Sequence, residues 1–212
     1  MAEAAPLHGY SVDPGPLVAA AFKAVHETRM HDVPILNPAV GVEAVGFAPW
    51  DAHWLGCLVT PWFMNLVLLP REPEKWVRLR PGEKHTYVFP AGAFEFIAGH
   101  EHTIGEYQAC SLFSPMFEFA DHQTARVTAE TCLKALFDAQ NREETDVQLL
   151  AKTDSLPEAA QKAAAEEAAD AAVAADAIPA TGPLAELKAK LETPMSKRDF
   201  LRGRFLGRDA GG

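Results

Sequence analysis

The stretch "HWLGCLVTPWFMNLVLLP", residues 53–70, is the densest apolar segment of the chain, and it decides the fold. Its second half alternates only weakly, because the residues that would point to either side of a strand are nearly all apolar: Phe63, Asn65, Val67 and Leu69 against Met64, Leu66 and Leu68. A strand with one solvated face would not look like this. We therefore expect helices on one side of this strand and some other cover on the opposite side. The alternative is that part of one face stays exposed as a docking surface.

Four other short apolar segments accompany this stretch, and prolines, glycines and charged residues separate them at short intervals. They are "VEAVGF" (42–47), "HTYVFP" (85–90), "AFEFIAG" (93–99) and "IGEYQACSL" (104–112). Short apolar runs divided by turn residues are typical of an antiparallel sheet.

Two helices are predicted, one on each side of these strands in sequence. Pro16 stands where a helix can start, and apolar residues near a 3.6-residue period predict a helix over 16–30. A second helix is expected within 121–141, with these residues on its apolar side: Val127, Leu133, Leu136 and Phe137, with Ala129 and Cys132 beside them. The combination predicts an α+β fold, a two-layer sandwich with a mainly antiparallel sheet and both helices packed on one face.

The composition changes abruptly after about residue 145. We expect a folded domain over 1–145 and an Ala-rich acidic linker over 146–182, too poor in large apolar residues to form a core. A short helix and a basic tail should occupy 183–212. The predicted C-terminal extension is therefore disordered or partly helical.

Charge is distributed unevenly along the chain, whose formal net charge is −10. Residues 1–140 carry 16 acidic and 9 basic side chains, whereas residues 177–212 carry 4 and 7. An acidic body argues against nucleic acid and favours a basic partner. Since no apolar stretch is long enough for a signal peptide or a membrane span, we expect a cytoplasmic protein.

No sequence signature predicts an enzyme or a bound cofactor. Nucleophile elbows, phosphate loops and His-Glu-x-x-His are all missing from the sequence. The three cysteines, Cys57, Cys110 and Cys132, include no Cys-x-x-Cys pair, so we expect buried free thiols and no bound metal. His100 and His102 with Glu106 could imitate a metal site, but exposed turn residues are the commoner interpretation.

Near the end of the chain, "PMSKRDFLRGRFLG" (194–207) resembles a bacterial twin-arginine export signal, although such signals stand at the N-terminus. The matching positions are Ser196, Lys197, Arg198, Phe200 and Leu201.

Three stretches closely resemble the HybE family of nickel-iron hydrogenase assembly chaperones, called HupJ in some operons. They are "NPAVGVEAVGF" (37–47), "WLGCLVTPWFMNLVLLP" (54–70) and residues 89–129, with "LVTPWFMNL", "FPAG" and "CSLFSPMFEF" as the most specific runs. The resemblance covers roughly residues 15 to 140 and leaves the linker and tail outside. It implies a small α+β fold and no catalysis.

The same resemblance implies a binding function and its partners. Family members are understood to bind the twin-arginine signal of the hydrogenase small subunit precursor, and the large subunit is a further candidate. Export would then wait until assembly is complete. The alternative is a scaffold or delivery factor that links hydrogenase subunits to the twin-arginine export machinery through its tail.

Candidate binding residues follow from the ligand, which presents two guanidinium groups before an apolar segment. Trp62, Phe63 and Met64 are expected to contact the apolar segment. Glu95, Glu118 and Asp121 are expected to receive the arginines, although a solvated acidic surface would show the same pattern. The tail is either a tethered copy of the signal that competes with cargo, or a basic amphipathic segment that touches membrane or partner.

Overall fold

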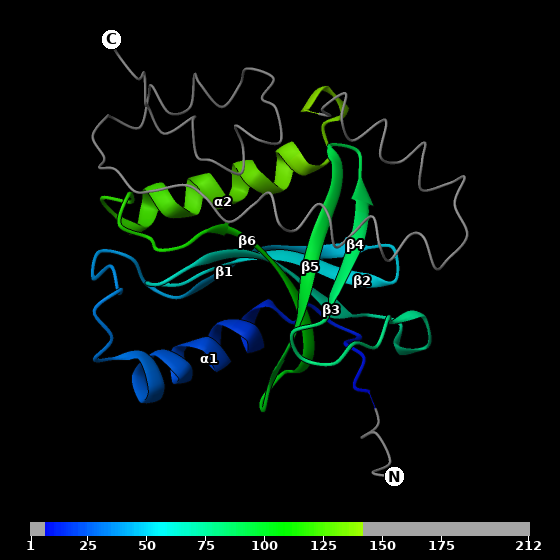
Figure 1. The fold of residues 1–212 in the computed structure, drawn as a ribbon, viewed down its shortest axis with the longest axis horizontal. Helices are drawn as coiled ribbons and strands as arrows, with labels where there is room; N and C mark the ends of the chain where they lie inside the picture. Colours follow the sequence, from blue (N-terminus) through cyan, green and yellow to red (C-terminus); the bar gives the residue numbers. More distant parts are fainter. Residues whose placement is uncertain (1–6, 142–212) are drawn as a thin grey trace. The chain divides into compact units, whose positions relative to one another are not determined.

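The sheet contains six strands in the order β1-β2-β3-β6-β5-β4 in the computed structural model, which describes residues 7–141 (Figure 1). The strands are β1 Glu43–Trp50, β2 His53–Val59, β3 Met64–Pro70, β4 Lys84–Phe89, β5 Gly92–Glu101 and β6 Gly105–Phe113. Two α-helices flank them in sequence, α1 Gly15–Val25 and α2 His122–Leu136, with a π-helical turn η1 over His26–Met30 directly after α1. Short 3-10 turns lie at η2 Pro73–Lys75 and η3 Ala139–Asn141. The predicted α+β class and the mainly antiparallel sheet are confirmed.

The described chain divides into two compact units. Residues 7–85 and 95–134 form the first, and residues 86–94 and 135–141 fall in the second. In the second unit the backbone N–H of Ala91 donates to the carbonyl of Leu136 at 3.1 Å, and the rings of Phe89 and Phe137 meet edge to face. No helix among residues 7–141 has the length and apolar character needed to cross a membrane.

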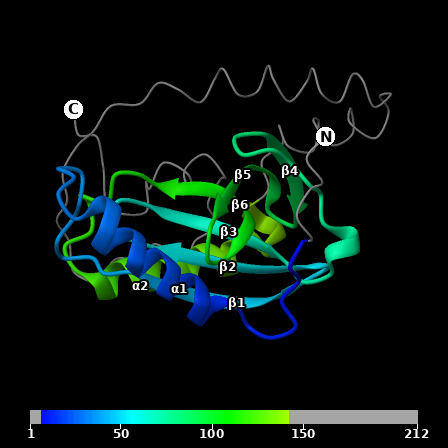
Figure 2. The ribbon, with the colours of Figure 1, turned by 90° about the horizontal axis from the view of Figure 1, so that it is seen from below.

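The two helices lie on opposite faces of the sheet, not on one face as the sequence interpretation expected (Figures 1 and 2). Leu58 of β2 packs with Val18 and Phe22 of α1, while its neighbour Cys57 lies beside Cys132 of α2. Successive residues of a strand point to opposite faces, so β2 contacts one helix from each side. Every residue of β2 is buried, and this two-sided burial explains why the central strands carry apolar residues at nearly all positions.

Small residues form most of the buried side of α2. The buried positions are Ala125, Thr128, Ala129, Cys132 and Leu136. Val127 and Leu133 are only half-buried, and Phe137 lies just after the helix with 46% of its surface exposed. The buried side of α2 therefore differs from the predicted one. The prediction followed the large apolar side chains, whereas small side chains let a helix pack close to a sheet.

Proline and glycine fix two local features of the α1 side. Pro16 occupies the first turn of α1, and the carboxylate of Asp13 accepts a hydrogen bond from the N–H of Gly15 at 2.8 Å. In β1 a bulge between Val45 and Ala48 contains Gly46 at a φ of +63°. The ring of Phe47 then lies over Gly56 of β2, where a Cβ atom would stand 2.2 Å from the ring.

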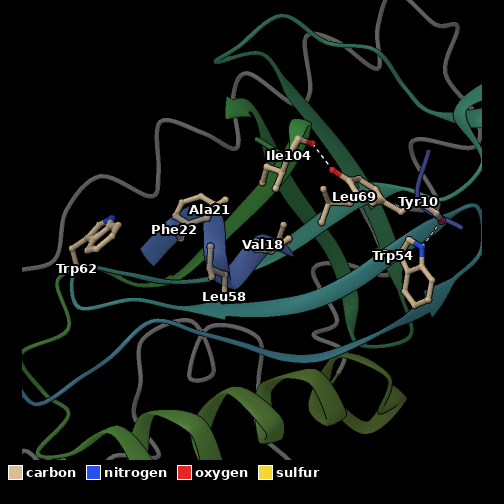
Figure 3. Close-up of a cluster of buried hydrophobic side chains, with 10 residues drawn as sticks. Tyr10, Val18, Ala21, Phe22, Trp54, Leu58, Trp62, Leu69 and Ile104 are labelled. Carbon is tan, nitrogen blue, oxygen red and sulfur yellow. Dashed lines mark hydrogen bonds between the residues drawn. The ribbon is translucent and has the colours of Figure 1, made fainter. Parts of the chain in front are cut away.

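The cluster of apolar side chains under α1 forms the main core of this face (Figure 3). Val18 and Phe22 of α1 pack on strand residues such as Leu58 and Leu69. Tyr10 closes one end of the cluster, because its hydroxyl donates to the carbonyl of Ile104 at 2.7 Å and its own carbonyl accepts from the indole of Trp54 at 2.9 Å.

One buried amide holds three loops together at one end of the sheet. The Nδ2 of Asn37 donates to the carbonyls of Met116 and Phe119 at 2.8 and 2.7 Å, and its backbone N–H donates to the carbonyl of Pro61 at 2.8 Å. We call this group the Asn37 loop cluster, made of residues 31–42, 60–63 and 114–121. It connects the segment after α1, the β2–β3 turn and the segment before α2.

His53, at the start of β2, packs between two tryptophans. Its ring centroid lies 5.7 Å from that of Trp50 and 5.5 Å from that of Trp76, and only 5% of the residue is exposed. Burial lowers the pKa of His53, because a charged imidazole is poorly solvated there.

Replacing the buried amide should destabilise the protein. Asn37→Ala leaves the carbonyls of Met116 and Phe119 without their donor, which should lower the free energy of unfolding by about 2–3 kcal/mol. Urea unfolding followed by tryptophan fluorescence measures this. The exposed Gln123→Ala serves as the control, and equal midpoints for the two variants would refute the role of Asn37.

The free energy of unfolding should also fall at acid pH in a way that depends on His53. The folded protein keeps His53 neutral, so the unfolded chain binds the extra proton as the pH drops below about 6.5. The stabilisation that comes from keeping His53 neutral is therefore fully present above that pH. It is lost as the pH falls towards the lowered pKa of His53 in the folded protein. His53→Gln should shrink the difference in urea midpoint between pH 7.5 and 5.5, whereas His100→Gln at an exposed position should not.

Candidate peptide-binding face

Helix α1 covers only part of its face of the sheet. The register places Val67 of β3, Ala109 of β6 and Ile97 of β5 in one row across the strands. Burial falls steadily along this row: Val67 is 1% exposed, Ala109 is half-buried and Ile97 is 45% exposed. Figure 2 shows the reason, since α1 lies in front of β1 and β2 and reaches β6 only at its edge, where Phe22 contacts Tyr107.

We call the uncovered part the open face. It consists of the outward side chains Phe63, Asn65, Glu95, Ile97, Ala109 and Ser111. Phe63 forms its link to α1, because its ring meets that of Phe22 edge to face at 5.9 Å. The open face thus continues the apolar core under α1 outward, with small and apolar residues at its centre.

A single amide stands within this face. Asn65 lies between Leu58 and Ser111 in the next row of the sheet, and its Oδ1 has no hydrogen-bond donor among residues 7–141. Buried acceptors are normally paired. The buried Oδ1 of Asn65 departs from that rule within residues 7–141.

Two carboxylates of β5 border the open face, and each already holds a basic side chain. Glu95 accepts from Lys84 at 2.9 Å, and Glu101 pairs with Arg29 of η1. The basic partners are well exposed, at 44% for Lys84 and 58% for Arg29. Exposed ion pairs contribute little to stability, so Glu95, itself 35% exposed, can exchange Lys84 for a cationic ligand at small cost, whereas the carboxylate of Glu101 is only 15% exposed.

Tyr107 stands at the border between α1 and the open face. Its ring contacts Phe22 edge to face and lies over Gly99, where a Cβ atom would be 2.5 Å from the ring. Burial raises the pKa of Tyr107, and the nearby carboxylate of Glu101 raises it further. The residue therefore stays neutral and packs as an aromatic wall.

The structure brings three of the six predicted binding residues to this region. Phe63 and Glu95 belong to the open face, and Trp62 packs on Phe63 and on His26 at its end. Trp62 is only 7% exposed, so its contribution is mainly to hold Phe63 in place. Met64 is fully buried in the core, so its side chain is not part of the surface.

The two remaining predicted carboxylates lie in the Asn37 loop cluster. Glu118 is half-buried there, beside the exposed Phe117. Asp121 caps α2, because its Oδ1 accepts from the N–H of Thr124 at 2.7 Å, and this hydrogen bond lowers the pKa of Asp121. Its carboxylate already has a structural role.

The histidines considered as metal ligands do not form a cluster. His100 and His102 are exposed, and Glu106 accepts a hydrogen bond from the indole of Trp76 at 3.2 Å. Within residues 7–141 no three His, Cys, Asp or Glu side chains lie close enough together to hold a metal ion. The three cysteines are buried free thiols.

Sequence reasoning missed Ile97, Ser111 and Asn65 as members of one surface. The signal was present in the alternation of "AFEFIAG" and "QACSLF", which places Glu95 with Ile97 and Ala109 with Ser111. Combining these strands needed their register, and the register becomes visible only in the structure.

Comparison with known proteins identifies relatives over most of the chain. The family model described as NiFe-hydrogenase assembly, chaperone, HybE matches residues 13–203. That match includes the Ala-rich segment and the tail as far as Gly203, which the sequence resemblance had left outside. The segments beyond 141 and the tail residues Ser196 to Leu201 lie outside the described residues.

Individual relatives agree with this match. Hydrogenase expression/formation protein HupJ of Bradyrhizobium diazoefficiens is 44% identical over 131 residues, which are 61% of this chain and 75% of that protein. Probable rubredoxin HupJ of Rhodobacter capsulatus is 43% identical over 129 residues, but the chain spans only 46% of its length. The solution structure of HybE from Escherichia coli has 27% identity and a TM-score of 0.53, covering 65% of this chain and 83% of that one.

Variants of Asp121 should separate its capping role from its charge. Asp121→Ala removes the acceptor for the N–H of Thr124 and should lower the free energy of unfolding by about 1 kcal/mol, whereas Asp121→Asn should keep most of it. Urea unfolding measures whether Asp121→Ala is less stable than Asp121→Asn. If Asp121→Ala unfolds at the wild-type midpoint, the cap contributes nothing.

Proposed function

Because the chain belongs to the HybE family of NiFe-hydrogenase assembly chaperones, we propose that it binds the twin-arginine signal of a hydrogenase small subunit and delays export until assembly is complete. It does this without catalysis and in the cytoplasm, where the signal is still attached. The large subunit is a second proposed partner. The observation that carries the proposal is the open face beside α1.

The open face suits the apolar part of such a signal. An apolar helix laid beside α1 would bury Ile97, Ala109 and Phe63 and extend the layer that α1 begins. Full burial of an exposed isoleucine side chain contributes about 1.5–3 kcal/mol, and Ile97, which is 45% exposed, would gain part of this before the cost of ordering the peptide. This contribution requires no rearrangement of the core.

The carboxylates at the border suit the arginines. A guanidinium group pairs with a carboxylate through two parallel hydrogen bonds, which a lysine cannot reproduce. At Glu95 an arriving arginine would replace Lys84, and at Glu101 it would replace Arg29. At Glu95 the exchange of lysine for arginine gains the two parallel hydrogen bonds, whereas at Glu101 one guanidinium group replaces another and the donor geometry stays the same.

The acidic character of the domain supports the same partner. Its first 140 residues carry an excess of acidic side chains, which raises the rate of encounter with a basic peptide. Glu118 with Phe117 offers a second acidic and aromatic patch in the Asn37 loop cluster. We assign the signal to the open face because apolar area and carboxylates adjoin there.

A scaffold or delivery role is the second candidate. It is favoured by the twin-arginine-like tail, which could contact the export machinery while the domain holds hydrogenase subunits elsewhere. Under that role the signal peptide alone would not bind the open face.

Substitutions on the open face test the proposal. In the full chain, Ile97→Lys places a charge at the centre of the face and should weaken binding of a small-subunit signal peptide at least tenfold in isothermal titration calorimetry. Val12→Lys, at a position that is 72% exposed, is the matched control and should bind within twofold of wild type.

Charge reversal tests whether the carboxylates at the border of the open face bind the arginines of the signal. Glu95→Lys should weaken binding, and Glu74→Lys, on the exposed turn η2, should not. Replacing both arginines of the peptide by lysine should remove most of the difference between wild type and Glu95→Lys. Wild-type affinity in both open-face variants would exclude this face as the signal site.

A further inference from the structure

The tail of the chain has the chemistry that the open face is proposed to recognise. Residues 196–201 read Ser-Lys-Arg-Asp-Phe-Leu, and a second basic and apolar unit, Arg204-Phe205-Leu206, follows. Between Pro194 and Arg208 there are five basic residues and one acidic residue. We propose that residues 194–207 dock on the open face of their own domain and keep it covered until cargo arrives.

In this arrangement the apolar and basic side chains of the tail would contact the apolar and acidic side chains of the open face. Ile97 and Ala109 would contact the apolar side chains of the tail, Phe200 and Leu201. Lys197 and Arg198 would meet the carboxylates at the border. Since charges are screened beyond about 8 Å at physiological salt, this attraction depends on such local pairs.

The covalent connection is long enough for the tail to reach the open face. From Asn141, the last described residue, 53 residues lead to Pro194. As a flexible coil such a segment averages roughly 40 Å from end to end. A domain of this size has a radius of gyration of about 14 Å. The tail can therefore reach any point of the domain surface.

The tether makes a weak contact effective. A linked segment has an effective concentration on the order of millimolar, so a tail with a dissociation constant of about 0.1 mM would occupy the face in roughly nine molecules of ten. The tail should indeed be weak, because Lys197 stands where a true signal has its first arginine. A cargo signal with both arginines would then displace it.

The family match supports the idea that the open face and the tail act together. It runs from residue 13 to residue 203 and so contains both the open face and the Lys197-Arg198 motif. The inference relies on the proposed function for the identity of the competing cargo, but the docking of the tail does not depend on it.

Two full-length variants test the docking without cargo. The tail variant carries Lys197→Gln, Arg198→Gln, Phe200→Ala and Leu201→Ala. The control carries Lys188→Gln, Lys190→Gln, Leu187→Ala and Leu191→Ala, which removes equal charge and similar apolar area just upstream. In two-dimensional NMR spectra the amide signals of Ile97, Ala109 and Ser111 should shift in the tail variant and stay at wild-type positions in the control.

Calorimetry with a small-subunit signal peptide completes the test. The tail variant should bind it about tenfold more tightly than wild type and the control. Unshifted open-face signals in the tail variant overturn the inference, whatever the peptide does. Shifts that appear only at high protein concentration also overturn it, since they would indicate a tail from a second copy. Shifted signals in a protein that binds no peptide would support tail docking while refuting the proposed function.

Discussion

One helix is too narrow to cover one face of this sheet, and much of the structure depends on that mismatch. An α-helix with its side chains is about 10 Å wide, whereas neighbouring strands are about 4.8 Å apart. Helix α1 therefore covers roughly two strands, and β6 and β5 extend beyond it on the same face (Figure 2). The sheet continues its apolar row from Val67 to Ile97 into a region where residues 7–141 supply no second helix.

The sequence predicted the local elements well, because each has a local cause. Pro16 predicted the start of α1, and prolines and glycines separated the six strands close to their observed ends. Two-sided burial of the central strands was also visible in "FMNLVLLP". What the sequence could not supply was the assignment of a helix to each face, because α2 uses Ala125, Ala129 and Cys132 against the sheet and so lacks a stripe of large apolar residues.

The candidate site was only partly predictable for a similar reason. Trp62, Phe63 and Met64 are adjacent in sequence, yet alternation and burial give them three different environments, and only Phe63 contributes to the open face. Asp121 looked like a free acid but caps a helix. Glu95 and Ile97 come from one strand and Ala109 and Ser111 from another, so the surface they share depends on a pairing between strands that no single segment encodes.

The amide of Asn37 has a consequence for how such a chain can vary. Its two hydrogen bonds span the carbonyls of Met116 and Phe119, so they fix the number of residues between these two points as well as the fold of the loop. Side chains that point outward there, such as Phe117, can be exchanged without disturbing this spacing. Insertion or deletion of a single residue would move one carbonyl out of reach. The outward positions of the segment before α2 should therefore vary in sequence more than its buried positions Met116 and Phe119, and the segment should hardly vary in length.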